Sequence, residues 1–123
     1  MVIDTTLFIE HLRAKDKTQT TLFKLPSTDL RYVSAVTVYE LFAGATDLSK
    51  ITAVRYELQG ILVLPFTTEV AEKSGELYKD LRRRGLMIEA TDIFIAATAL
   101  VNNLPVKTLN ERHFARVEGL LLV

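Results

Sequence analysis

The chain has 123 residues, of which 49% are hydrophobic and 24% are charged, and its 15 basic and 15 acidic side chains cancel. This length fits one domain with a real core, and the balanced charge excludes recruitment of nucleic acid by an overall positive field. The absence of cysteine excludes disulfides and thiol catalysis. Since the chain has no long apolar run and its start lacks signal-peptide features, we expect a cytoplasmic protein forming a single domain over residues 1–123.

Short apolar runs alternate along the chain with patterns of helical period. From the N-terminus, the runs typical of buried strands lie at residues 1–3, 31–34, 61–64, 104–108 and 120–123. The helical patterns lie at residues 7–12, 22–25, 36–47, 49–59, 67–84 and 91–103, and residues 110–114 form a loop or turn. This alternation predicts a three-layer α/β/α fold with a central parallel sheet of four to five strands.

Several residues are suited to the ends or turns of these helices. Thr5 and Thr6 can cap the first helix. Residues 82–84 are three arginines at a helix C-terminus, where the helix dipole attracts cations, so we favour a structural role over steering of phosphates. Gly85 is suited to a left-handed stop. Gly44 lowers helix propensity, and we expect it to allow another backbone to pack closely.

The helical pattern at residues 91–103 is apolar almost all the way round, which is typical of a helix in the middle of a fold. Asp92 nevertheless lies in its first turn. A carboxylate at the entrance to a buried helix needs hydrogen-bond partners, counter-charge or a metal, because desolvation of the bare ion is costly. An acid that only complements the helix dipole is the simpler alternative.

Four polar residues are expected at one edge of the predicted sheet. Asp4 ends the first strand, Glu40 lies early on the helix after the second, Asp92 begins a crossover helix, and Asn110 follows the fourth strand. Because three carboxylates in one crevice repel each other, we expect a neutralising cation, and oxygen ligands favour Mg²⁺ or Mn²⁺. The simpler alternatives are a capping box from Thr37 to Glu40 and turn roles for Asp4 and Asn110.

Other polar residues near these positions have simpler interpretations. Glu89 and Glu111 could be auxiliary acids, although surface roles are favoured. His11 and His113 have no metal-ligand spacing and no nearby nucleophile motif, so we interpret both as structural. Phe114 is interpreted as a core anchor after the loop.

Four segments, residues 2–5, 34–41, 92–97 and 108–114, together resemble the successive motifs of PIN-domain ribonucleases. In order, spacing and length, the chain most resembles VapC-type toxins of type II toxin–antitoxin systems. The resemblance implies a PIN-like fold and an endoribonuclease dependent on Mg²⁺ or Mn²⁺. It implies that Asp4, Glu40 and Asp92 bind metal and that Asn110 is a fourth site residue. It also implies an RNA substrate, a cognate antitoxin and a homodimer.

Two residues depart from the pattern of the family. Asn110 stands where many relatives have Asp, and Thr6 stands where Asn is often found, although its hydroxyl could still brace a carboxylate. The alternative interpretation is a catalytically weak or inactive PIN module that binds RNA or a protein partner. The sequence leaves open the RNA target, the number of metal ions and the identity of the antitoxin.

Overall fold

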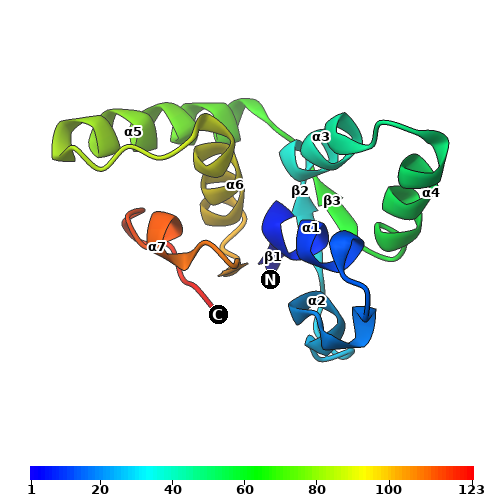
Figure 1. Ribbon diagram of the computed structural model, residues 1–123. Helices are drawn as coiled ribbons and strands as arrows, with labels where there is room; N and C mark the ends of the chain where they lie inside the picture. Colours follow the sequence, from blue (N-terminus) through cyan, green and yellow to red (C-terminus); the bar gives the residue numbers. More distant parts are fainter.

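The central sheet has four short parallel strands in the order β3-β2-β1-β4, in a computed structural model that describes all 123 residues (Figure 1). The strands are β1 (Val2–Ile3), β2 (Tyr32–Ser34), β3 (Leu62–Leu64) and β4 (Val106–Lys107). The chain proceeds outward from β1 to β3 and then returns to place β4 on the other side of β1. The strand order therefore reverses between β1 and β4, where open α/β folds form their crevice.

The helices lie on both faces of this sheet, which confirms the predicted α/β/α class. They are α1 (Thr5–Arg13), the 3-10 helix η1 (Lys17–Gln19), α2 (Thr21–Lys24), α3 (Ala35–Gly44), α4 (Leu48–Glu57), α5 (Thr68–Arg84), α6 (Ala90–Val101) and α7 (Glu111–Phe114). Figure 1 shows α5, α6 and α7 on one side and α1 to α4 on the other. No helix is both long enough and apolar enough to span a membrane.

Two hydrophobic cores follow from the alternation of side chains along β1. Val2 packs into the core that contains residues of α5, α6 and α7, whereas the next residue, Ile3, packs into the core beneath α1, α3 and α4. Both side chains are fully buried. Because β1 has a core on each of its faces, the residue that follows it, Asp4, is held rigidly at the edge of the sheet.

The apolar helix predicted around residues 91–103 is confirmed as α6. Its buried residues are Ile93, Ile95, Ala96, Ala97, Thr98 and Ala99. It packs between α5 and the sheet, where β2 contacts it directly. The helix therefore fixes the position of its first turn, which carries Asp92.

Three local predictions have different outcomes. Gly85 ends α5 with φ of 68°, as expected for a left-handed stop. The predicted fifth strand is reduced to a single parallel bridge between Val106 and Leu122. The expected close packing within the chain at Gly44 is wrong, because a Cβ there would meet no atom within 4 Å. Gly44 instead lies at the exposed end of α3.

Candidate functional site

Asp4 lies at the carboxyl edge of the sheet and is 2% exposed. It occupies the N-cap position of α1, but its carboxylate accepts no hydrogen bond from the backbone of that helix. Its Oδ2 atom instead accepts hydrogen bonds from the hydroxyls of Thr6 at 2.8 Å and Thr108 at 2.7 Å. Oδ1 has no hydrogen-bond partner in the chain. Since no fully buried side-chain oxygen lacks a partner, Oδ1 is open to solvent.

The two threonines that hold Asp4 are themselves oriented by backbone amides of the loop after β4. The N–H of Leu109 donates to Thr6 Oγ1 at 3.1 Å, and the N–H of Asn110 donates to Thr108 Oγ1 at 2.8 Å. Each hydroxyl accepts one hydrogen bond and donates another to the same carboxylate oxygen. The arrangement fixes the Asp4 side chain and leaves one of its oxygens available. It confirms that Thr6 braces a carboxylate, and the predicted capping roles of Thr5 and Thr6 are wrong.

Glu40 reaches the site from the second turn of α3. The N-cap of α3 is Ser34, whose hydroxyl accepts a hydrogen bond from the N–H of Val36 at 3.1 Å. Thr37 therefore lies inside the helix, which excludes the capping box between Thr37 and Glu40. Thr5 Oγ1 lies 2.7 Å from Glu40 Oε1 and 3.0 Å from Thr37 Oγ1. We assign the Thr5 hydroxyl as a donor to Glu40 rather than to Thr37, because a hydrogen bond to a carboxylate is stronger than one to a neutral hydroxyl.

Asp92 lies in the first turn of α6, and its side chain is 16% exposed. Burial raises the pKa of this carboxyl to about 6, and the negative charges of Asp4, Glu89 and Glu40 contribute to the rise. An acid whose only role was to complement the helix dipole would not meet three other carboxylates. The contributions of Asp4 and Glu40 to this rise are consistent with the predicted convergence of the three acids at one edge of the sheet.

Asn110 and His113 lie at the start of the short helix α7, beside Asp92. Asn110 Nδ2 is 2.8 Å from His113 Nδ1, and the same ring nitrogen is 4.0 Å from Asp92 Oδ2. His113 therefore lies beside the candidate site, and its predicted structural role stays a prediction. The structural role predicted for His11 is consistent with its burial and its contacts with Thr20 and Glu57.

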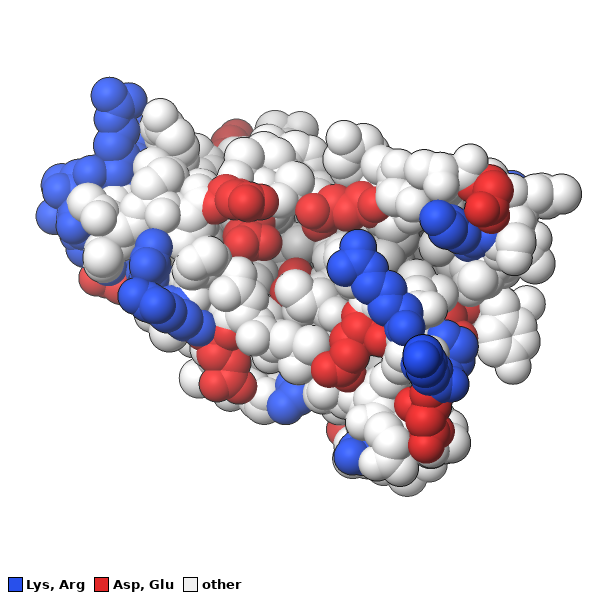
Figure 2. Space-filling view, in the orientation of Figure 1, with Lys and Arg blue, Asp and Glu red and all other residues white.

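The acidic site has no basic side chain to neutralise it. No Lys or Arg nitrogen lies within 4.0 Å of the carboxylates of Asp4, Glu40 or Asp92. Figure 2 shows acidic side chains gathered near the middle of one face, while Lys and Arg gather at the end of α5. There Arg83 and Arg84 both pair with Asp80, which supports the structural interpretation of that basic run.

The donor chemistry of this site suits a hard divalent cation. Asp4, Glu40 and Asp92 each have an oxygen without a hydrogen-bond partner in the chain, and carboxylate oxygens are ligands that Mg²⁺ and Mn²⁺ prefer. No three acidic or histidine side chains lie close enough together to enclose an ion directly. Mg²⁺ usually keeps several waters and uses only one or two carboxylates, so the residues fit a hydrated ion.

The sequence interpretation missed two residues that hold the acids, Thr5 and Thr108, and the contact of His113 with Asn110. Thr5 and Thr108 carried a detectable signal, since each is a hydroxyl residue within two positions of a predicted site residue. Their partners could not be assigned, because the bond from Thr108 to Asp4 joins residues 104 positions apart. His113 carried no comparable signal.

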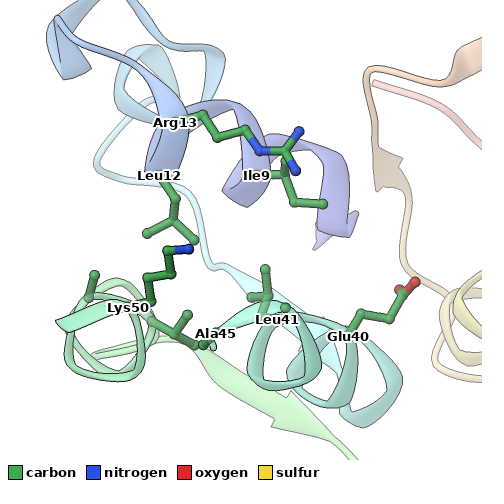
Figure 3. Close-up of a pocket in the computed structure, with 10 residues that line it drawn as sticks. Ile9, Leu12, Arg13, Glu40, Leu41, Ala45 and Lys50 are labelled. Carbon is green, nitrogen blue, oxygen red and sulfur yellow. The ribbon is translucent and has the colours of Figure 1, made fainter. Parts of the chain in front are cut away.

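A groove of about 310 Å³ runs beside the acidic site between α1 on one side and α3 and α4 on the other (Figure 3). In Figure 3, Ile9 and Leu12 of α1 face Leu41 of α3 and Ala45 across the groove. The groove is lined mainly by apolar side chains. A short aliphatic or helical segment would find a matching surface there.

Charged residues mark the two ends of this groove. Glu40 and Lys50 lie toward opposite ends of it, and the Arg13 side chain extends back along α1 over Ile9 (Figure 3). Arg13 makes no ion pair with an acidic side chain of the chain. The groove is therefore lined mainly by apolar side chains, with Glu40 at one end, Lys50 at the other and the Arg13 side chain along α1 between them.

Comparisons with known proteins agree with this fold. The sequence matches the PIN domain family over residues 1–120. It is 32% identical to Ribonuclease VapC10 of Mycobacterium tuberculosis, covering 98% of this chain and 90% of that protein. It is 30% identical to Ribonuclease VapC19 of the same species, with coverage of 92% and 90%.

A crystal structure of DNA-bound VapBC from Salmonella typhimurium superposes with a TM-score of 0.86 and 27% identity, covering 99% of this chain and 95% of that one. The structure and the sequence thus lead to the same family. The chain belongs to the PIN domain family, and the relatives that it matches over almost its whole length are VapC ribonucleases.

Proposed function

We propose that the protein is an endoribonuclease dependent on Mg²⁺ or Mn²⁺, acting in the cytoplasm as the toxin of a toxin–antitoxin pair. The observation that carries the proposal is the group formed by Asp4, Glu40 and Asp92, which have open oxygens and no basic partner. The names of the VapC relatives support RNA as the substrate.

In this proposal, Asp4, Glu40 and Asp92 hold the metal, and Asn110 is a neutral fourth ligand or orients a water. A bound divalent ion supplies positive charge that activates a water and stabilises the oxygens of the scissile phosphate. The chain supplies the positions: Thr108 holds Asp4, and α6 holds Asp92. A bound cation would favour the ionised form of Asp92, whose pKa is raised to about 6 mainly by burial.

A direct test is cleavage of structured RNA by the purified chain. Addition of Mg²⁺ or Mn²⁺ should produce cleavage, EDTA should stop it, and excess metal should restore it. Cleavage that continues at the same rate in EDTA would contradict the proposed dependence on metal.

The second candidate is a PIN module that binds RNA or a protein partner without cutting. It is favoured by the amide at Asn110 and by the absence of three closely grouped acidic or histidine ligands. Titration with Mn²⁺ distinguishes the two functions. Binding in the micromolar to millimolar range supports the nuclease, whereas its absence together with tight RNA binding supports the second candidate.

The partner that we propose for the groove between α1, α3 and α4 is an antitoxin segment. Solved neighbours of this fold include VapBC toxin–antitoxin complexes, such as the Salmonella typhimurium structure. Given the charged residues that line the groove, the segment should have an apolar face, acidic residues opposite Arg13 and Lys50, and a basic residue near Glu40. Such a basic residue would compete with metal for the acidic site.

We further propose that the protein is a homodimer that uses the edge of the sheet at β3. Leu62 and Val63 on this edge strand are 53% and 51% exposed, and Phe66 and Tyr39 nearby are 43% and 68% exposed. An exposed edge strand flanked by large apolar residues is a surface that folded proteins usually cover. A second copy would cover it symmetrically.

A further inference from the structure

We propose that His113 is a positioning residue that decides which end of the Asn110 carboxamide faces the crevice. The inference rests on the proposed metal-dependent function, and it gives a role to an imidazole that the acidic site does not otherwise need. Either oxygen of a carboxylate can face a cation, whereas an amide has only one oxygen, so Asn110 must be oriented to contribute it.

The backbone of Asn110 is fixed on both sides. Its N–H donates to Thr108 Oγ1 at 2.8 Å, and its carbonyl accepts hydrogen bonds from the N–H groups of His113 at 3.2 Å and Phe114 at 3.3 Å. Phe114 is fully buried and anchors α7 in the core. The backbone of residue 110 is thus held in place, and rotation of its terminal amide exchanges the oxygen and the nitrogen.

The ring of His113 selects one of these two orientations. Nδ1 of the ring lies 2.8 Å from Asn110 Nδ2. In the tautomer that carries its proton on Nε2, Nδ1 is an acceptor, so it pairs with the amide nitrogen and would repel the amide oxygen. Asn110 Oδ1 is then left without a hydrogen-bond partner in the chain and is the end that remains available to a ligand.

The orientation of the amide decides whether Asn110 can contribute to a cation site. An amide oxygen coordinates hard cations or accepts a hydrogen bond from their waters, whereas an amide NH₂ would present hydrogen atoms to the ion. His113 Nδ1 also lies 4.0 Å from Asp92 Oδ2, so the oriented amide stands beside a proposed metal-binding carboxylate. Asn110 and His113 thus act as one unit.

The test is a double-mutant cycle read by Mn²⁺ binding, measured from the EPR signal of free Mn²⁺. His113→Ala should weaken binding about tenfold when residue 110 is Asn, as is typical when a group that orients a ligand is removed. In the Asn110→Asp background, His113→Ala should change the Mn²⁺ affinity by less than about twofold, because the two oxygens of a carboxylate are equivalent. His113→Gln, whose amide oxygen can accept from Asn110, should recover most of the affinity.

Arg112→Ala is the matched control, since Arg112 is an exposed neighbour on the same helix and should not change Mn²⁺ affinity. Thermal unfolding of each variant checks that α7 remains folded. If His113→Ala causes equal losses in the wild-type and Asn110→Asp backgrounds, or no loss in either, the role of His113 is overturned even if the wild-type chain binds Mn²⁺ and cuts RNA. A wild-type chain that does neither would overturn the proposed function and this inference with it.

Discussion

Thr108 Oγ1 lies 2.7 Å from Asp4 Oδ2, and this hydrogen bond ties the loop after β4 to the end of β1 at the point where the strand order reverses. It joins the first and last of the four motif segments directly. The geometry of the proposed metal site therefore depends on a residue that carries no charge.

Replacement of Thr108 by valine should lower both stability and activity. The change keeps the shape of the side chain but removes a donor to a buried carboxylate, and loss of such a charge-assisted hydrogen bond costs about 2 kcal/mol. Urea denaturation should show this loss, and RNA cleavage should fall about tenfold because Asp4 is no longer oriented. Thr108→Ser retains the hydroxyl and should remain close to wild type. Equal behaviour of the serine and valine variants would contradict the importance of this bond.

The raised pKa of Asp92 predicts a dependence of stability on pH in the absence of metal. Its pKa is about 6 in the folded chain, against 3.8 for an ordinary aspartate. The folded chain binds this proton more tightly than the unfolded chain, so the contribution to stability is complete below pH 3.8 and is lost as the pH rises through about 6.

Asp92→Asn removes this titration and should isolate its effect. In EDTA, the variant should be more stable than wild type by on the order of 1 kcal/mol at about pH 7.5, allowing for partial screening by solvent, and the difference should shrink toward about pH 4. Chemical denaturation across this range measures it. A difference that stays constant with pH would contradict the raised pKa of this carboxyl.

The groove predicts a variant that separates partner binding from catalysis. Ala53 lines the groove from α4, is exposed, and is not one of the proposed metal-binding residues. Ala53→Arg should fill the groove and reduce affinity for the proposed antitoxin partner by more than about tenfold, since a buried unpaired charge is costly. RNA cleavage should be unchanged. Antitoxin binding with wild-type affinity would place the partner elsewhere.

The apolar surface at β3 predicts a variant that stays monomeric. Val63→Lys places a charge on the exposed edge strand, where it should prevent pairing with a second copy. Light scattering after size exclusion should give twice the chain mass for wild type and a single chain mass for the variant. Wild-type protein that is already monomeric at micromolar concentration would contradict the proposed dimer.

The fold and the convergence of the acids could be predicted because both follow from local patterns. Asp4 ends a buried parallel strand and Asp92 begins a crossover helix, and these two positions meet at one edge of any such sheet. The same reasoning placed Asn110 after the fourth strand, and the family resemblance added the order and spacing of the four motif segments. The predicted classes of the main strands and helices followed from the same alternation.

The remaining features depend on contacts between distant side chains. Nothing in the local sequence indicates that Thr6 and Thr108 donate to the same oxygen of Asp4, or that His113 faces Asn110 rather than solvent. The last apolar run looks like a full strand but makes only one bridge at Leu122, because strand propensity does not fix the extent of pairing. Such features are set by tertiary packing.

The central claim is that the open carboxylates form a cation site used for RNA cleavage. The most direct measurement is Mn²⁺ affinity and RNA cleavage for Asp92→Asn beside a matched control, Glu72→Gln, which makes the same chemical change on the exposed surface of α5. We predict that Asp92→Asn loses cleavage and binds Mn²⁺ at least about tenfold more weakly, while Glu72→Gln behaves as wild type. Wild-type Mn²⁺ affinity and cleavage in folded Asp92→Asn would contradict the claim.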